Sequence, residues 1–245
     1  MAIISTEAIV LKVQDHRETS RLVTFFTKNC GKVKGVLKGI RKDPRKFGSS
    51  VDKLSVNDIV FYQYRNTDIH LVSQCDMKEF FLLIRQDARR ITAAEYGAEM
   101  LDRIMPVEER ASAIYDLFLD YLRTLGAEKD LGRLVRMFQV KILSLSGFRP
   151  HIEACVGCGC EVRGRARFSL VRGGLVCSRC ELRDGASMPV SPGTIATLLH
   201  IEKNPWKDCQ KLKMAASIKQ EMGRILNNFL VFHLGKHIKS AKYLS

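Results

Sequence analysis

Two pairs of cysteines with identical spacing constrain this chain more than any other sequence feature. Cys155 and Cys158 form one Cys-x2-Cys pair, Cys177 and Cys180 form the other, and 18 residues separate the two pairs. Two residues between cysteines let both thiolates of a tight turn face one ion, and two such turns complete a tetrahedron of sulfur ligands. We therefore expect these four cysteines to bind one Zn²⁺ ion.

The expected ion is structural, because a closed shell of four thiolates leaves no coordination position for a reactive water molecule. Three alternatives remain open: reduced cysteines without a metal, an iron–sulfur centre, or a ligand set that includes Cys160 or His151. Neither of these two residues has the paired spacing. The other cysteines, expected to be packed thiols, are Cys30, Cys75 and Cys209.

The charge of the chain indicates a polyanionic partner. Forty Lys and Arg residues against 26 Asp and Glu residues give a formal net charge of +14, which suits a nucleic acid or a membrane surface. No stretch approaches the roughly 18 apolar residues of a membrane span, and the first residues lack the basic region of a signal peptide. Eight cysteines without an export signal favour a reducing compartment, so we expect a cytoplasmic protein.

The first part of the chain is rich in short strand patterns. Five runs are expected to be strands, at residues 3–13, 21–27, 32–40, 56–64 and 69–75. Five short strands in fewer than eighty residues fit a small closed barrel, of which the oligonucleotide-binding (OB) fold is one. We expect this barrel to occupy residues 1–78.

From about Met77 onward the apolar positions follow a helical period. Helices are predicted up to Met105, at 111–125, at 131–145, from Ser191 to His200 and at 208–234. The expected fold class is therefore α+β, a five-stranded OB barrel followed by an α-helical domain at residues 79–245. The cysteine pairs form a zinc-binding insertion in that domain, at residues 151–184.

A cluster of basic residues surrounds the third predicted strand. Val33, Gly35 and Leu37 alternate with lysines that share the opposite face, and a basic loop follows. Such a surface suits a sugar-phosphate backbone, although a solvated strand and loop is the alternative. The residues predicted to bind nucleic acid are Lys32, Lys34, Lys38, Arg41, Lys42, Arg45 and Lys46. The candidates for base stacking, with plain barrel packing as the alternative, are Phe47, Tyr62 and Tyr64.

The sequence contains no recognisable catalytic motif. Phosphate-binding Gly-x-x-x-x-Gly-Lys-Ser/Thr loops, Gly-x-Ser-x-Gly, His-Glu-x-x-His and the deaminase signature are all absent, and the six histidines are scattered. We therefore expect a binding protein rather than an enzyme.

The chain resembles the bacterial RecO recombination mediator family in three places: its opening strands, the approach to the first cysteine pair and its last residues. Residues 7–11, 17–27 and 31–39 are similar to the opening strands of that family, Gly147-Phe-Arg-Pro150 leads into the first cysteine pair as it does there, and residues 233–240 resemble the closing Leu-Gly…Leu-Lys-Ser signature. The order of elements matches over essentially the whole chain. One departure is Phe47-Gly-Ser-Ser50, which follows only loosely the basic, serine-containing loop of the family.

The resemblance implies a function and a set of partners. It implies binding of single- and double-stranded DNA, annealing of complementary strands, contact with the acidic tail of single-stranded-DNA-binding protein, and work with RecR to load RecA near the nucleoid. The family's motifs do not place its partner sites in this chain. Arg133 and Arg136, which flank an apolar stripe of a predicted helix, are our own candidates for the acidic-tail pocket, with solvated helix charges as the alternative. An RNA-binding or ribosome-associated zinc protein and a zinc-ribbon nucleic-acid enzyme, such as a nuclease, also remain open.

Overall fold

The computed structural model describes residues 2–43, 47, 51–162, 164, 166–181, 187–235 and 238–243. The chain forms two compact units, Met1–Ala127 and Glu128–Ser245. Within the described ranges, no helix combines the length and the apolar character needed to cross a membrane.

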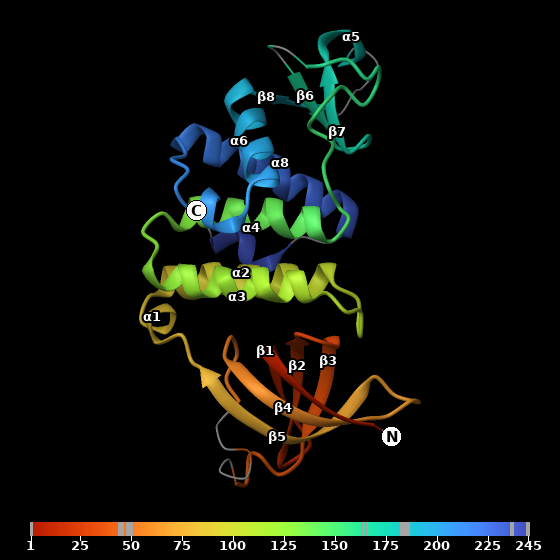
Figure 1. Ribbon diagram of the computed structural model, residues 1–245, viewed down its shortest axis with the longest axis vertical. Helices are drawn as coiled ribbons and strands as arrows, with labels where there is room; N and C mark the ends of the chain where they lie inside the picture. Colours follow the sequence, from red (N-terminus) through yellow and green to blue (C-terminus); the bar gives the residue numbers. More distant parts are fainter. Residues whose placement is uncertain are drawn as a thin grey trace. The chain divides into compact units, whose positions relative to one another are not determined.

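The first unit begins with a closed barrel of five strands in the order β1-β2-β3-β5-β4 (Figure 1). The strands are β1 (Ala2–His16), β2 (Ser20–Thr27), β3 (Gly31–Leu37), β4 (Val56–Gln63) and β5 (Ile69–Glu79). Neighbouring strands are antiparallel except for β3 and β5, which are parallel. This arrangement is an OB fold, and it confirms the predicted strand-rich start and its five strands.

The barrel core follows from the alternation of β3. Val33 and Leu37 are buried, whereas Lys34 and Val36 are only half-buried on the outer face. Gly35 lies between the two buried residues because a Cβ atom there would come within 2.4 Å of a methyl group of Val72. The core is completed mainly by aliphatic and aromatic side chains from the other strands.

Three helices follow the barrel in the first unit: α1 (Leu82–Arg85), α2 (Ala88–Ile104) and α3 (Ser112–Ala127). The helical pattern predicted from Met77 begins later than expected, because β5 continues to Glu79 and the Asp87 carboxylate caps α2 by accepting from the backbone N–H of Arg89 at 2.8 Å. Pro106 lies just beyond the end of α2, as predicted.

The second unit combines helices with a small antiparallel sheet of order β7-β6-β8 (Figure 1). Its helices are α4 (Leu131–Leu145), α5 (Ser178–Glu181), α6 (Pro192–Lys203), α7 (Trp206–Cys209), α8 (Ala216–Leu234) and a 3-10 helix at Lys239–Tyr243. Its strands are β6 (Ala166–Ser169), β7 (Gly174–Cys177) and β8 (Ser187–Val190). The predicted insertion between the helices is therefore a cysteine-bearing sheet.

The prediction of one continuous helix at 208–234 is wrong. The chain forms the short α7 and then leaves the helical path until Ala216. The Arg133 guanidinium explains the break, since its Nη1 donates to the carbonyl oxygens of Gln210 at 2.6 Å and Leu212 at 2.7 Å. These carbonyls therefore have a side-chain donor where a continuous helix would supply backbone donors.

Candidate metal centre and basic barrel surface

The four paired cysteines lie together in the second unit. The sulfur atoms of Cys155, Cys158, Cys177 and Cys180 are all within 4.8 Å of one another. The first two come from the turn that precedes β6, Cys177 ends β7, and Cys180 lies on α5. This cluster can hold one metal ion, and four thiolates are a ligand set that suits Zn²⁺.

Backbone pairing brings the two cysteine turns together. The backbone N–H of Val156 donates to the carbonyl of Leu175 at 2.8 Å, which joins the first turn to β7. Gly157 is required at the contact, because a Cβ atom there would lie 2.9 Å from the Cys180 sulfur. The distances between the sulfurs thus depend on Gly157 in the first cysteine turn and on β7, which leads into the second cysteine turn.

Backbone N–H groups also lower the pKa values of two of the cysteine thiols. Burial raises the pKa of Cys155, but N–H groups of Cys177 (N to sulfur 3.3 Å) and Gly157 (3.4 Å) outweigh it and lower the pKa overall. The N–H groups of Cys180 and Arg179, at the start of α5, lower the pKa of Cys177 to about 6. Hydrogen bonds with the neighbouring thiols, that of Cys158 foremost, raise the pKa of Cys180 to about 12. A bound divalent cation would stabilise all four thiolates.

The two alternative ligands differ in their placement. The backbone of His151 pairs with Gly174, its N–H donating to Gly173 and its carbonyl accepting from Leu175, each at 2.8 Å. His151 therefore supports the sheet through its main chain. Cys160 is outside the group of four mutually close sulfurs, yet its Sγ lies 3.3 Å from that of Cys158.

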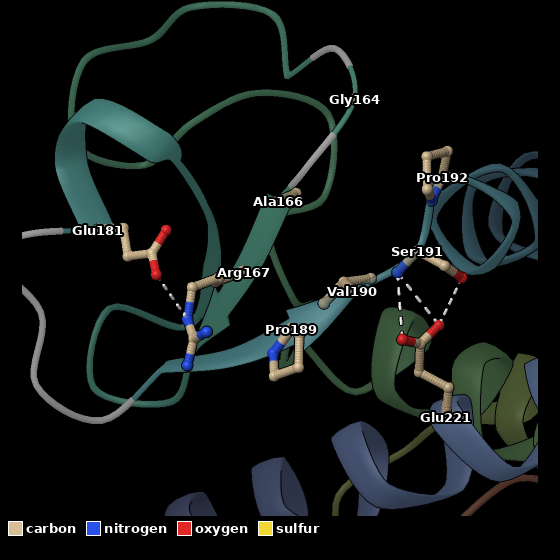
Figure 2. Close-up of a pocket in the computed structure, with 9 residues that line it drawn as sticks. All are labelled: Gly164, Ala166, Arg167, Glu181, Pro189, Val190, Ser191, Pro192 and Glu221. Carbon is tan, nitrogen blue, oxygen red and sulfur yellow. Dashed lines mark hydrogen bonds and ion pairs between the residues drawn. The ribbon is translucent and has the colours of Figure 1, made fainter.

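Two polar clusters hold the cysteine-bearing sheet in place, and both line an open cavity of about 690 Å³. Figure 2 shows Arg167 of β6 facing Glu181, the residue after Cys180, with 3.3 Å between Nε and Oε1. Arg167 also donates to the Ser187 hydroxyl of β8 at 2.8 Å. The guanidinium of Arg167 thus links α5 and β8 to β6, the central strand of the sheet.

The second cluster joins the sheet to the helices. Glu221 of α8 accepts hydrogen bonds from the backbone N–H of Ser191 at 3.1 Å and from its hydroxyl at 2.6 Å (Figure 2). Burial would raise the pKa of Glu221, but the bonds from Ser191 and Thr194 outweigh it and lower the pKa. The Glu221 carboxylate is therefore an anchor for the start of α6, and the cavity is lined by charged groups that already have partners.

The three predicted packed thiols behave in two ways. Cys75 and Cys209 are buried, and burial raises the pKa of Cys75 to about 12. Cys30 is half-buried. None of the three is part of the four-sulfur cluster.

Lys32, predicted to contact nucleic acid, has a different environment in the first unit. It is buried, and its ammonium donates to the backbone carbonyl of Asp102 at 2.5 Å and lies 3.4 Å from the Asp102 carboxylate. Because Asp102 also pairs with Lys12 of β1, the three side chains fasten α2 to the barrel. Lys32 therefore has a structural partner and does not present its charge to the solvent.

The other described members of the basic cluster are on the surface. Lys34 lies on the outer face of β3, and Lys38 and Lys42 are exposed beyond the end of that strand. Arg41 is exposed too, with its Nη2 3.7 Å from the Asp15 carboxylate. Arg45 and Lys46 lie outside the described residues.

The structure adds a basic residue that the sequence pattern did not indicate. The backbone N–H of Arg41 donates to the carbonyl of Thr19 at 3.0 Å, so the chain after β3 lies against the turn between β1 and β2. Arg17 is exposed in that turn, with a left-handed φ of 54°. The sequence signal that could have indicated Arg17 is its position in the turn between the predicted strands at residues 3–13 and 21–27.

The three aromatic candidates separate clearly. Phe47 is 2% exposed and belongs to the barrel core, so the packing alternative holds and its predicted role in base stacking is wrong. Tyr62 is half-buried, and Tyr64 is 38% exposed near the end of β4. Tyr64 is therefore the most accessible ring of the three.

The two arginines predicted to bind an acidic tail make contacts within the protein. The Arg133 guanidinium is mostly buried, pairs with Glu128 and binds the two carbonyls described above. Arg136 donates to the side-chain oxygen of Gln139 at 2.6 Å. Both guanidinium groups therefore have partners within the second unit.

Comparison with known proteins agrees with this architecture. Two family models match the chain, Recombination protein O N terminal over residues 1–81 and Recombination protein O C terminal over residues 85–242. A DNA repair protein RecO of Symbiobacterium thermophilum is 29% identical over 248 residues, covering 100% of this chain and 97% of the relative. A DNA repair protein RecO of Moorella thermoacetica is 29% identical, and the match covers 98% of this chain and 89% of the relative. A DNA repair protein RecO of Thermoanaerobacter sp. strain X514 is 28% identical, and the match covers 100% of this chain and 98% of the relative.

An OB barrel followed by helices that carry a four-cysteine sheet, matched along both parts by recombination-protein models, defines a class of recombination and DNA repair proteins. Within that class, the chain belongs to the RecO family. Membership gives it the role of a recombination mediator in DNA repair.

Proposed function

We propose that the barrel, residues 1–78, binds single- and double-stranded DNA and anneals complementary strands, while residues 79–245 form a helical domain stabilised by one Zn²⁺ ion. The observation that carries the proposal is the set of cations on the outer surface around β3, of which Lys34 is half-buried and the other four described members are exposed. We name this set the basic barrel surface, and its described members are Arg17, Lys34, Lys38, Arg41 and Lys42. Arg45 and Lys46 are proposed to extend it.

The placement of these residues suits an OB fold. Barrels of this kind bind oligonucleotides on the face of strands 2 and 3 and with the loop between strands 1 and 2. Lys34 lies on the outer face of β3, where it is paired in register with Thr24 of β2, and Arg17 lies in the β1–β2 turn. The exposed ring of Tyr64, close to the loop between β4 and β5, adds a surface on which a base can stack.

Annealing requires two phosphate backbones to approach each other despite their mutual repulsion. A cationic surface without base-specific contacts lowers this repulsion and gains free energy from the release of counterions. The formal net charge of +14 supports this role, and no catalytic group is needed for it. We propose further that the protein acts with RecR and with the acidic tail of single-stranded-DNA-binding protein to load RecA.

A four-residue substitution tests the DNA-binding surface. Changing Lys34, Lys38, Arg41 and Lys42 to alanine should weaken oligonucleotide binding and flatten its dependence on salt, since each lost phosphate contact lowers the slope by about 0.7. The matched control removes the same charge from exposed lysines of the second unit, namely Lys203, Lys207, Lys211 and Lys213. Equal affinity and slope in the barrel variant and the unaltered protein would contradict the proposal.

Annealing itself is measured with complementary strands coated by their single-strand-binding protein. We expect the unaltered protein to speed annealing and the barrel variant to lose most of that effect. Parallel titrations with RNA of the same sequence separate the proposal from an RNA-binding function, because tighter binding to RNA than to single-stranded DNA would favour the latter.

A further inference from the structure

We propose that Cys160 is a fifth metal-binding thiol that can take the place of Cys158, so that one ion is held by either of two sets of four cysteines. This inference rests on the proposed zinc centre and deepens it. The alternative set is Cys155, Cys160, Cys177 and Cys180.

The position of the Cys160 sulfur carries the inference. It lies 3.3 Å from the sulfur of Cys158, closer than the 3.8 Å between the sulfurs of Cys158 and Cys177. It therefore contacts the proposed ligand Cys158 directly while remaining outside the group of four.

The local backbone lets Cys160 approach without disturbing the rest of the centre. Only Gly159 separates it from Cys158, and Gly159 has a left-handed φ of 71° with no atom within 4 Å of an added Cβ. The backbone N–H of Cys155 donates to the carbonyl of Cys160 at 2.9 Å, which keeps Cys160 beside the first turn. A rotation of the Cys160 side chain and a small shift of this exposed turn would bring the Cys160 sulfur to the ion.

The other three ligands have no such freedom. Cys155 is 1% exposed and its sulfur accepts two backbone N–H groups, Cys177 is fixed at the end of β7, and Cys180 is fixed on α5. Cys158 is the exposed member of the set. Exchange is thus confined to Cys158, the most exposed of the four ligands.

The exchange is balanced in protons and charge. When Cys160 binds the ion its thiol loses a proton, and the released Cys158 thiolate gains one, so the centre keeps four thiolates and the same net charge. The consequence is that damage to the exposed Cys158 sulfur would not release the ion.

Zinc competition against a chromophoric chelator tests the inference with four variants. We expect Cys158→Ser and Cys160→Ser each to retain one Zn²⁺ with affinity reduced less than about 10-fold, and Cys155→Ser and the Cys158→Ser/Cys160→Ser double variant to lose more than about 100-fold. Cobalt absorption provides a second readout, because its sulfur-to-metal band should show four thiolates in each of the first two variants and three in the double variant. Circular dichroism checks that each variant is folded.

The outcomes separate the inference from the metal centre itself. A Cys158→Ser protein that loses zinc as completely as Cys155→Ser would overturn the inference alone. So would a double variant that binds zinc as well as Cys158→Ser does. An unaltered protein that binds no zinc would overturn the metal centre and the inference together.

Discussion

At the scale of single residues, Gly157 sets how closely the two cysteine turns approach. An added Cβ atom would lie 2.9 Å from the sulfur of Cys180 and 3.1 Å from its Cβ, so the second turn would have to move. We therefore predict that Gly157→Ala weakens zinc binding by about 10- to 100-fold, the range found when supports of a metal site are altered. Zinc competition measures the loss.

The control for this prediction is Gly132→Ala. Gly132 lies in the first turn of α4, and the nearest atom to an added Cβ is at 3.7 Å, an ordinary contact. Alanine favours a helix over glycine by up to about 1 kcal/mol, so this variant should bind zinc normally and be slightly more stable. Equal zinc affinity in both variants would show that the close approach at Gly157 does not matter.

Asp102 gives a residue-scale prediction for pH. Burial raises its pKa, but the ammonium groups of Lys12 and Lys32 outweigh this effect and hold the pKa below its ordinary value. A carboxyl group with a lowered folded-state pKa stabilises the protein above its unfolded pKa of about 3.9, and this stability is lost as the pH falls through the lower folded value. Asp102→Asn should therefore cost about 3 kcal/mol near pH 7 and progressively less below about pH 4.

Denaturant unfolding at several pH values measures this difference. The control is Asp116→Asn, which removes an exposed partner 3.7 Å from Lys28 and should cost less than about 1 kcal/mol. A penalty for Asp102→Asn that stays constant from pH 7 to pH 3 would show that the Asp102 charge does not contribute to stability.

At the scale of elements, Arg133 determines where the final helices begin and end. Its side chain is 12% exposed and holds the carbonyls of Gln210 and Leu212 between α7 and α8. Arg133→Ala removes the guanidinium that donates to these two carbonyls and pairs with Oε2 of Glu128, so we expect a loss of about 3 kcal/mol in the free energy of unfolding. Exposed Lys129 provides the control, and Lys129→Ala should change stability by less than about 0.5 kcal/mol.

The same experiment tests the sequence-based role of Arg133. If Arg133→Ala left stability unchanged but abolished binding of an acidic peptide, the side chain would belong to a partner site, as the helix pattern first suggested. A loss of stability together with unchanged peptide binding would support the structural role.

Elements whose pattern is local could be predicted from the sequence. The alternation of Val33 and Leu37 with Lys34 located β3, and the two Cys-x2-Cys pairs located the four-sulfur cluster, because each of these patterns lies within a few neighbouring residues. The break between α7 and α8 could not be predicted, since the donor that causes it is 77 residues away from Gln210. The burial of Lys32 was hidden for the same reason, because its partner is 70 residues distant.

At the scale of the whole molecule, the proposed metal centre and the basic barrel surface belong to different units. The four cysteines lie in Glu128–Ser245, whereas the basic barrel surface lies in Met1–Ala127. A metal that acts only by holding its own sheet should therefore affect folding of the second unit and leave DNA binding by the first unit intact. The excess of positive charge does not by itself distinguish these roles, because basic residues occur in both units.

Removing the metal separates the two roles. We predict that a zinc chelator, or Cys155→Ser, costs about 3 kcal/mol or more and lowers the Tm of the second unit by about 10 °C. Oligonucleotide affinity, followed by fluorescence anisotropy below that transition, should change less than about twofold, since the counterions released by the barrel cations are the same. Cys30→Ser, in the first unit, should change neither the zinc content nor the transition of the second unit. A metal-free protein that keeps its fold but loses DNA binding would place the cysteine-bearing sheet within the DNA-binding surface.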